Sequence, residues 1–451
     1  MLPMRPGPPD LLLVNPWIYD FTAYDFWLKP LGLLYMASII RSNLSARLHF
    51  LDCLDRFHPG LAKPQKSKPD GRGSYPKEEV PKPEVLKDIP RKYSRYGIPP
   101  ALFEDELSRL PVPDAVLITC TMTYWYPGVQ LAVELVRKRF EGVPIILGGV
   151  YATLAAEHAR RYSGADIVIA GPAENEILPA LRNILGDSVI GEAQYPSFGD
   201  LPKPAMDLLR DRKWLPILTS RGCPYRCAFC AGPLLFNGFE QREPASAAAE
   251  IEEAFARFGT RNFVFYDDAL LLNKKNHAIP ILEEIARKKL PLSFHTPNGL
   301  HVREIDQELA HLFKKAGVSS VYLSQETFDA RVIGESCPKV EPGDFEKALV
   351  CLESAGYPRE EINVYLIAGL PGQTVASIVD SVRRVQSLGA KPRLAFFSPI
   401  PGTRVWDELV RAGKMRVDAD PLLHNKMTFP YLWGDFSTAD FAALRSVLEG
   451  R

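Results

Sequence analysis

The stretch Arg221-Gly222-Cys223-Pro224-Tyr225-Arg226-Cys227-Ala228-Phe229-Cys230 decides how the chain is interpreted. It holds three of the seven cysteines, spaced Cys-x3-Cys-x2-Cys, and it follows an apolar run, Leu215 to Leu218, that predicts a strand. Thiolates bind iron well, and a 4Fe–4S cube needs four ligands, so this loop predicts a cluster with one iron open to a small molecule. A zinc site would need a fourth cysteine or histidine close by, and neither occurs between Cys230 and His277.

This spacing, with Phe229 before the last cysteine, resembles the signature of the radical S-adenosylmethionine (SAM) superfamily. The resemblance implies that Cys223, Cys227 and Cys230 hold a 4Fe–4S cluster and that SAM binds the open iron beside Phe229. It also implies an external one-electron reductant of the flavodoxin or ferredoxin type.

Length and composition narrow the class of protein. A chain of 451 residues is too long for one ordinary core and predicts two domains or more. The 54 basic and 54 acidic residues cancel, which gives no argument for a nucleic-acid partner. The N-terminus lacks the apolar core of a signal peptide, no apolar run reaches the ~18 residues of a membrane span, and the odd cysteine count disfavours a disulfide framework. We expect a cytoplasmic protein without a membrane partner.

The N-terminal third, expected as a domain over residues 1–190, alternates strands and helices. This pattern predicts a doubly wound, Rossmann-like parallel sheet with ligands at the carboxyl ends of its strands. The expected strands are Leu11–Asn15, Arg47–Leu51, Ala115–Cys120, Pro144–Leu147 and Asp166–Ala170, and the expected helices are Leu31–Arg41, Tyr126–Phe140 and Ala152–Arg161.

Directly before the cysteine triplet, this order of elements resembles radical SAM proteins with an N-terminal cobalamin-binding domain. Gly148 to Thr153 matches the Gly-Gly-x-x-x-Thr sequence of that family, whereas Gly171-Pro172-Ala173-Glu174 departs from its Gly-Glu-x-Glu sequence. The resemblance implies cobalamin as a cofactor. The implied cobalamin-binding residues are Asn15, Pro16, Thr121, Met122, Thr123, Gly148, Gly149, Val150, Gly171 and Pro172.

A histidine ligand for cobalt is not predicted. Other cobalamin domains use Asp-x-His-x-x-Gly after the first strand, and no such sequence follows Asn15. The run Asp55 to Gly60 has similar residue types in a different spacing, which indicates that His58 is a loop histidine. Members of the radical SAM family usually bind cobalamin without a histidine ligand, so the side chains facing cobalt are expected from the loop Thr121 to Trp125.

A long connection, 56–111, interrupts this domain. Its first part is rich in proline and charge, and connections of this length are usually functional or disordered. The run from Arg91 to Tyr96 interleaves basic and aromatic side chains, which suit an anionic or aromatic substrate, and a solvated charged loop is an equal alternative. Arg91, Tyr93 and Tyr96 are therefore candidate substrate residues in a segment that we expect to cover the active site.

The composition of 191–214 is that of a linker, and strand–helix alternation restarts after it. The superfamily resemblance implies a partial (β/α)6 barrel of the TIM type over 215–414, and 415–451 is expected to form a small helical cap. The expected barrel strands are Leu215–Leu218, Asn262–Tyr266, Leu292–His295, Ser320–Ser324, Asn363–Ala368 and Arg393–Phe397.

The carboxyl ends of these strands carry the candidate SAM-binding residues, because barrel chemistry lies at that face. The resemblance places SAM against Phe229, Tyr266, Asp267, Asp268, Glu326, Gly369 and Pro371. One of the two aspartates could instead cap the next helix. His295 and Asn298 follow the third strand and are candidates for contact with SAM or substrate.

The main hypothesis is a cobalamin-dependent radical SAM methyltransferase that methylates an unactivated centre of a small molecule or peptide. The resemblance implies that the cluster cleaves SAM to a 5′-deoxyadenosyl radical and that cobalamin carries the methyl group. Two alternatives stay open: a cobalamin-associated radical enzyme that cyclises or rearranges its substrate, and a non-enzymatic cobalamin or cluster sensor. The sequence assigns no catalytic acid or base.

Overall fold

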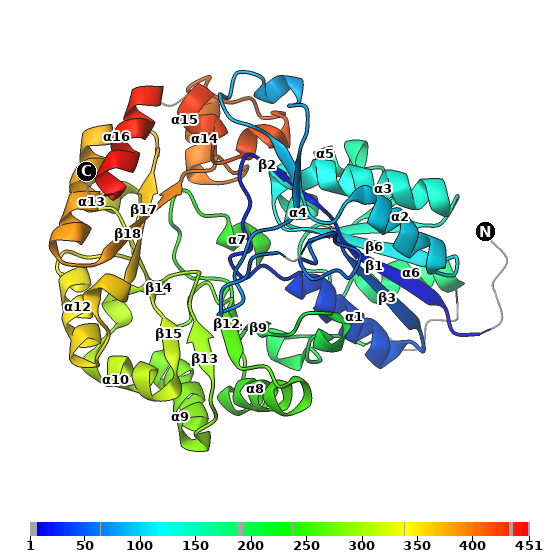
Figure 1. Ribbon diagram of the computed structural model, residues 1–451, viewed down its shortest axis with the longest axis horizontal. Helices are drawn as coiled ribbons and strands as arrows, with labels where there is room; N and C mark the ends of the chain where they lie inside the picture. Colours follow the sequence, from blue (N-terminus) through cyan, green and yellow to red (C-terminus); the bar gives the residue numbers. More distant parts are fainter. Residues whose placement is uncertain are drawn as a thin grey trace. The chain divides into compact units, whose positions relative to one another are not determined.

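The structure is a computed structural model that describes residues 7–63, 65–186, 193–236, 238–337, 339–432 and 436–449 (Figure 1). The chain forms two compact units. The first comprises Met1–Arg212 together with Asp420–Leu423, and the second comprises Lys213–Ala419 together with His424–Arg451. The expected domain boundary at residue 190 lies outside the described residues, and the other expected boundaries stay predictions.

The first unit is built on a five-stranded parallel sheet. Its order is β3-β1-β6-β7-β8, so the direction of strand addition reverses between β1 and β6. β1 and β6 are buried along their whole length, as expected for strands covered on both faces. The predicted doubly wound sheet is confirmed. The strands are β1 Asp10–Asn15, β3 Arg47–Asp52, β6 Ala115–Cys120, β7 Ile145–Gly149 and β8 Ile167–Val168.

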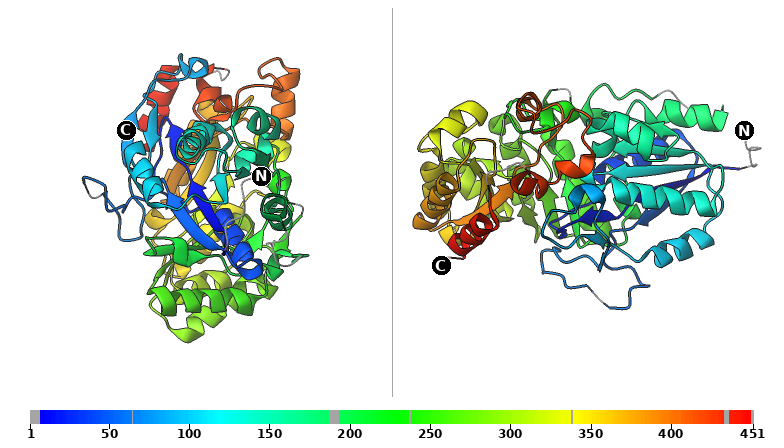
Figure 2. Two further views of the ribbon diagram at one scale, coloured as in Figure 1. Left: turned by 90° about the vertical axis from the view of Figure 1, so that its right-hand side faces the viewer. Right: turned by 90° about the horizontal axis from the view of Figure 1, so that it is seen from above.

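Helices lie on both sides of this sheet (Figure 2). Leu13 of β1, Ile40 of α1 and Leu181 of α6 share one apolar core. The single helix expected from Ala152 to Arg161 is two short helices, because the backbone leaves the helical conformation at Ala155. The helices are α1 Leu31–Asn43, α2 Pro100–Arg109, α3 Tyr126–Arg139, α4 Val150–Leu154, α5 Ala156–Tyr162 and α6 Ile177–Leu185.

The long connection has secondary structure of its own. β4 (Lys77–Glu79) and β5 (Ser94–Tyr96) join β2 (Ile18–Asp20) in a three-stranded antiparallel sheet of order β2-β5-β4. A buried ion pair between Arg56 and Asp25, with Nε and Oδ2 2.8 Å apart, ties the start of the connection to the segment after β2. The connection is therefore largely folded onto its own unit.

The second unit contains two four-stranded parallel sheets, β15-β13-β12-β9 and β14-β16-β17-β18. The third expected strand is β13, and the short strand β14 follows it, whereas the fourth expected strand is interrupted at Val321. As a result β13 pairs with β15 and β14 pairs with β16. Thr296 bridges the break: its N–H donates to Ser320 O, and its Oγ1 accepts from Tyr322 N–H. The strands are β9 Trp214–Ile217, β12 Asn262–Phe265, β13 Ser293–His295, β14 Leu300–His301, β15 Val318–Ser320, β16 Tyr322–Glu326, β17 Asn363–Ala368 and β18 Lys391–Phe396.

If β13 with β14, and β15 with β16, are each counted as one position, six successive strand positions form one parallel wall. Helices follow the strands along the chain. The expected partial (β/α)6 barrel is confirmed. The longer helices are α8 Pro244–Phe258, α9 Ala278–Lys288, α10 Gln307–Ala316, α12 Asp344–Ser354, α13 Val375–Ser387, α14 Arg404–Arg411 and α16 Thr438–Leu448. The shorter elements are β10 Ser220–Arg221, α7 Gly232–Leu235, β11 Glu240–Gln241, α11 Ala330–Ser336 and α15 Thr428–Leu432.

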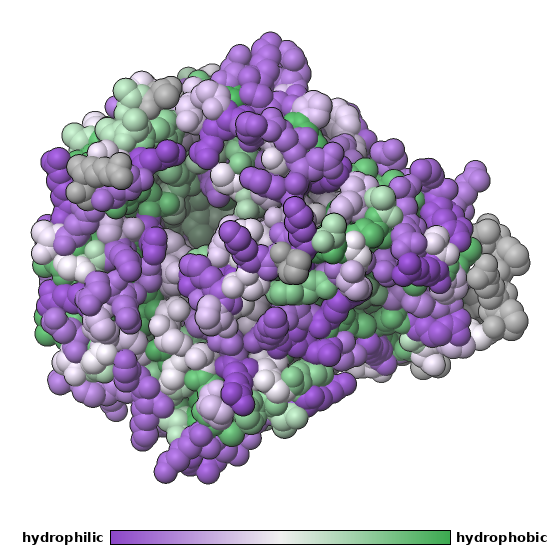
Figure 3. Space-filling model, viewed as in Figure 1, coloured by the Kyte–Doolittle hydropathy of each residue, from purple (hydrophilic) through white to green (hydrophobic). Residues whose placement is uncertain are grey.

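The face of the molecule in Figure 3 is mostly hydrophilic, with apolar side chains scattered over it. In the described part of the chain, no helix has both the length and the apolar character that crossing a membrane requires.

Candidate functional site

The cysteine loop of the second unit begins in a tightly closed turn. β10 and β11 pair antiparallel and bring the residues before and after the loop together. Gly222 has φ +76°, and a Cβ at this position would lie 2.0 Å from the carbonyl oxygen of Gly238. Only glycine fits so close an approach of two backbone segments, which explains why it precedes Cys223.

Asp267, which follows β12, holds the base of this loop. Its buried carboxylate accepts hydrogen bonds from Thr219 Oγ1 at 2.6 Å, Ser220 N–H at 2.5 Å and Ser220 Oγ at 2.6 Å. Thr219 N–H also donates to it, and the Nε2 atom of His277 lies 2.9 Å from Thr219 Oγ1. This predicted SAM-binding residue therefore has its oxygens engaged with the loop, which suits a positioning role.

The three cysteines of the loop are free thiols. Cys227 is buried, Cys223 is half-buried and Cys230 is exposed. Burial raises the pKa of all three thiols, that of Cys227 to about 11, and for Cys223 and Cys227 the charges of neighbouring cysteines contribute in the same direction. Thiols gathered at the carboxyl end of parallel strands, with one open to solvent, fit the donor set of an iron–sulfur cluster. Among the described residues, no three His, Cys, Asp or Glu side chains converge as a single metal ion would require.

Glu326 and Lys339 form an ion pair beside the cysteines. Glu326 ends β16 with φ +65°, an unusual backbone conformation for a residue other than glycine and one that is enriched at functional sites. Its Oε1 atom lies 2.8 Å from Lys339 Nζ, and both side chains are nearly buried. Burial by itself lowers the pKa of Lys339, but the carboxylate of Glu326 outweighs it, so the pKa is raised and Lys339 is a permanent cation.

Lys339 was not predicted from the sequence. Its charge acts on Cys223, Cys227, Cys230 and Asp268, which places the ammonium within the same site. It follows α11 rather than a barrel strand, so no strand-end pattern marks it. No sequence motif therefore identifies Lys339 as a residue of the site.

Asp268, next to Asp267, has a different environment. The surrounding protein and the charge of Asp267 raise the pKa of Asp268 to about 6. The hydrogen bonds from Thr219 and Ser220 all go to Asp267, and none of them goes to the carboxyl group of Asp268. Of the two predicted aspartates, Asp268 is the one with oxygens available to a ligand.

The other residues predicted on the barrel rim divide into exposed and internal groups. Asn298 Nδ2 donates to the carbonyl oxygen of Tyr266 at 2.7 Å and so supports the rim. His295 is buried, with Nδ1 2.9 Å from Ser320 Oγ and Nε2 3.3 Å from Asn262 Oδ1. Both ring nitrogens of His295 are thus engaged within the strand wall.

Phe229 and the turn after β17 come together. Phe229 packs against an apolar cluster that includes Ile367 and Leu370, next to the predicted residues Gly369 and Pro371. The side chain of Gln373 braces this turn by accepting from Gly369 N–H at 3.0 Å and donating to Ile367 O at 3.1 Å. The structure therefore joins the cysteine loop to the Gly-Leu-Pro-Gly sequence.

In the first unit, Gly148 at the end of β7 and Gly171 after β8 form a bare backbone surface. A Cβ on Gly148 or Gly171 would meet nothing within 4 Å, so both positions face open space. Thr153 links the two loops: its Oγ1 donates to Gly149 O and accepts from Gly171 N–H, both at 2.9 Å. This bridge is a physical reason for the threonine of the Gly-Gly-x-x-x-Thr sequence. An open, side-chain-free rim fits a broad planar ligand such as a corrin.

Several residues predicted to bind cobalamin are buried in the first unit. Asn15, Pro16 and Thr123 are buried. Asn15 Nδ2 donates to Asp52 Oδ1 at 2.7 Å, and burial raises the pKa of Asp52 to about 6. Met122, by contrast, is 40% exposed.

The candidate substrate residues of the long connection are mostly internal. Tyr93 is 2% exposed and packs edge-on against Phe21, with ring centroids 5.3 Å apart. Tyr96 is also buried and its hydroxyl donates to Phe21 O at 3.3 Å. Arg91 is half-buried. Tyr96 belongs to an apolar cluster with Ile18, Leu54 and Tyr75, and a substrate role for the two tyrosines stays a prediction.

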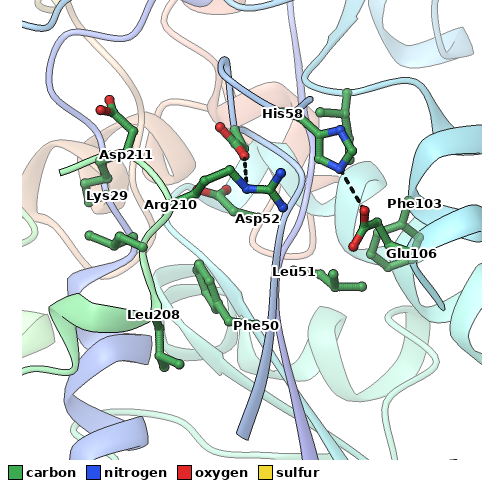
Figure 4. Close-up of a pocket in the computed structure, with 13 residues that line it drawn as sticks. Lys29, Phe50, Leu51, Asp52, His58, Phe103, Glu106, Leu208, Arg210 and Asp211 are labelled. Atoms are coloured by element: carbon green, nitrogen blue, oxygen red, sulfur yellow. Dashed lines mark ion pairs between the residues drawn. The ribbon is translucent and has the colours of Figure 1, made fainter. Parts of the chain in front are cut away.

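A separate small pocket, with a volume of about 60 Å³, lies at the carboxyl end of β3 (Figure 4). Within it His58 Nε2 lies 3.3 Å from Glu106 Oε1, and Arg210 Nε lies 3.1 Å from Asp55 Oδ2. His58 Nδ1 accepts from Gly60 N–H at 3.1 Å. His58 is thus a buried loop histidine with an acidic partner.

Comparisons with known proteins agree with this architecture. The radical SAM superfamily model matches residues 217–385, and the B12 binding domain model matches residues 96–181. An uncharacterized methyltransferase of Pyrococcus horikoshii is 26% identical over 65% of this chain and 69% of its own length. The bacteriochlorophyllide d C-8(2)-methyltransferase of Chlorobaculum tepidum is 29% identical over 40% of this chain, and the match spans 44% of that protein.

Solved structures share the fold. The radical SAM methyltransferase TsrM from Kitasatospora setae, with tryptophan and a SAM analogue bound, has a TM-score of 0.67 at 16% identity, covering 97% of this chain and 89% of that chain. The cobalamin-dependent SAM radical enzyme OxsB has a TM-score of 0.61 at 12% identity, covering 97% and 66%.

The fold and the site define a radical SAM enzyme. The chain carries a radical SAM domain and a B12 binding domain, and the curated relatives described above are named as methyltransferases. Its cofactors are a 4Fe–4S cluster, SAM and cobalamin.

Proposed function

We propose that this protein is a cobalamin-dependent methyltransferase that methylates an unactivated centre of a small molecule or peptide. The observation that carries the proposal is that one chain combines a free three-cysteine loop in a partial barrel with a bare glycine rim in a B12-binding fold. Relatives that match parts of the chain are named as methyltransferases.

In this proposal each group of residues has a separate task. Cys223, Cys227 and Cys230 hold the cluster, and Asp267 keeps their loop in place through Thr219 and Ser220. When bound, the cluster and SAM supply a 5′-deoxyadenosyl radical, and cobalamin supplies a methyl group.

Charged residues then orient SAM. The carboxylate of Asp268 accepts hydrogen bonds from the methionine ammonium, and Lys339, already paired with Glu326, contributes the positive charge that a carboxylate ligand requires. Phe229 and the turn from Gly369 to Pro371 provide an apolar wall with exposed backbone for the adenine. Because these groups are held by the fold before SAM arrives, little reorganisation is needed on binding.

In the first unit, Gly148 and Gly171 leave space for the corrin beside Gly149 and Pro172, and Thr153 holds the two loops at a constant spacing. Thr121, Met122 and Val150 complete the rim at the ends of β6 and β7. An external one-electron donor of the flavodoxin or ferredoxin type would reduce the cluster.

The test is cofactor content and methyl transfer after anaerobic purification from cells supplied with cobalamin. We expect about four irons and one cobalamin per chain. With a reductant and methyl-labelled SAM, we expect S-adenosylhomocysteine and labelled methyl on the cobalamin. The Cys227→Ala variant should lose 5′-deoxyadenosine formation and keep its cobalamin.

The same measurement separates the alternatives. Iron without cobalamin, even after soaking, would contradict methyl transfer and favour a cyclisation or rearrangement. Full cofactor loading with no 5′-deoxyadenosine under any reductant would favour a sensor.

A further inference from the structure

Met122 presents an exposed thioether at the carboxyl end of β6. It is 40% exposed, whereas the next two residues of its loop, Thr123 and Tyr124, are buried. A single exposed apolar side chain is ordinary on a protein surface, so the argument for a ligand rests on where Met122 lies in the sheet.

The backbone around Met122 is firmly held. Its carbonyl oxygen accepts a hydrogen bond from Cys120 Sγ at 3.0 Å and another from Trp125 N–H at 3.3 Å. The indole Nε1 of Trp125 in turn donates to the buried carboxylate of Asp20 at 3.0 Å. Met122 itself is extended, with φ −141° and ψ 144°. The exposed side chain therefore projects from a braced position rather than from a loose loop.

The position of Met122 in the sheet is where a doubly wound fold binds its ligand. β6 is the central strand, and the strand order reverses between β1 and β6. Ligands of such sheets lie beyond the carboxyl ends of the strands at this reversal. Gly148, where a Cβ would meet nothing within 4 Å, and Gly149 end the neighbouring strand β7.

No histidine of the first unit is available at this place. His49 Nε2 lies 2.8 Å from Asp10 Oδ1 in the edge pair of β3 and β1, and His58 lies with Glu106 in the pocket beyond β3. His158 Nδ1 lies 2.7 Å from the hydroxyl of Tyr151. These three are the only histidines within residues 1–212 and 420–423, and all are described.

We propose that Met122 is the residue that this protein presents to the cobalt of cobalamin. The inference rests on the proposed function and deepens it by naming the group on the protein-facing side of the metal. A thioether is soft and polarisable, so it packs well against a conjugated ring and approaches a transition metal without binding it as strongly as an imidazole. The methyl and methylene groups of Met122 would also exclude water from the cobalt.

The test places a nitrogen ligand at the same site. In the Met122→His variant, reconstituted with cobalamin and reduced to cobalt(II), we expect nitrogen superhyperfine splitting in the electron paramagnetic resonance spectrum. The wild-type spectrum should show none from the protein. The matched control is Val85→His, because Val85 is also 40% exposed and lies in the 3-10 turn Glu84–Leu86 of the long connection. It should bind cobalamin and give the wild-type spectrum.

A second variant tests water exclusion. In Met122→Ala, oxygen-17 water should broaden the cobalt(II) signal, whereas the wild-type signal should be unaffected. Broadening in this variant would support the proposal even where the histidine variant fails to retain cobalamin.

Three results would overturn the inference: cobalamin-loaded Met122→His without splitting together with unbroadened Met122→Ala, splitting in Val85→His as well, or a wild-type signal already broadened by labelled water. A wild-type protein that binds no cobalamin would instead contradict the proposed function.

Discussion

At the scale of single residues, the ion pair of Glu326 and Lys339 is the most consequential feature of the barrel. The two side chains are only 12% and 13% exposed, so each charge depends on the other for compensation. The positive φ of Glu326 adds backbone strain at the same place. A buried pair of this kind adds little net stability, because two apolar residues of similar volume would cost no desolvation.

We predict that Lys339→Met lowers the free energy of unfolding by roughly 3 kcal/mol, because Glu326 is left as an uncompensated buried charge. The double variant Lys339→Met with Glu326→Gln should recover most of that loss, and both variants should bind SAM weakly. Urea unfolding under anaerobic conditions and SAM titration measure the two effects.

The control is Lys92→Met, which removes the ammonium from an exposed ion pair with Glu79 and should leave both quantities unchanged. Wild-type stability in Lys339→Met would contradict the assigned role of the pair.

At the scale of elements, the two aspartates that follow β12, Asp267 and Asp268, have different surroundings. Asp267 receives the donors of Thr219 and Ser220 at the start of the cysteine loop, and Asp268 does not. The same division explains why Thr219 and Ser220, between β9 and the cysteine loop, can be completely buried, since Asp267 accepts from all their donors.

We predict that Asp267→Asn lowers iron content after anaerobic reconstitution, because an amide nitrogen would face donors that need an acceptor. Asp268→Asn is the matched control at the adjacent position. It should keep full iron and lose SAM affinity.

Iron analysis and SAM titration on the two variants give the comparison. Full iron in Asp267→Asn, with loss of iron in Asp268→Asn, would reverse the roles that we assign.

At the scale of the whole molecule, the chain leaves the first unit at Arg212 and returns to it for the short segment Asp420–Leu423. The hydroxyl of Tyr126 donates to both carboxylate oxygens of Asp420, at 3.1 and 3.2 Å. Burial raises the pKa of Tyr126, and the charge of Asp420 raises it further, so the hydroxyl stays protonated and can donate. Stacking of Tyr126 on Tyr151 fixes the ring.

We predict that Tyr126→Phe increases hydrogen exchange of the amides in Asp420–Leu423 by about tenfold. The reason is that a hydrogen bond to a charged group contributes about 1.5 kcal/mol, and every 1.4 kcal/mol is a factor of ten in local opening. Tyr162→Phe, at a tyrosine that is 51% exposed, should leave this exchange unchanged. Equal protection of the segment in Tyr126→Phe and wild type would contradict the assigned anchor.

Local patterns predicted much of the fold. Ala115–Cys120 and Asn363–Ala368 appear with the expected bounds, because continuous apolar runs of this length are the signature of strands covered on both faces. The spacing of Cys223, Cys227 and Cys230 located the loop for the cluster, since ligands from one loop need only a short stretch of sequence. The order of strands and helices likewise determined both fold classes.

The tertiary structure decided what depends on residues far apart in the sequence. It paired Glu326 with Lys339, separated the roles of Asp267 and Asp268, and brought Asp420 to Tyr126. It also split the fourth expected barrel strand at Val321. These features follow from packing and from the satisfaction of buried charges and donors, which involve partners that no local pattern contains. Short-range periodicity therefore determined the architecture, ligand spacing predicted the cluster loop, and long-range compensation of buried polar groups decided the geometry of the candidate site.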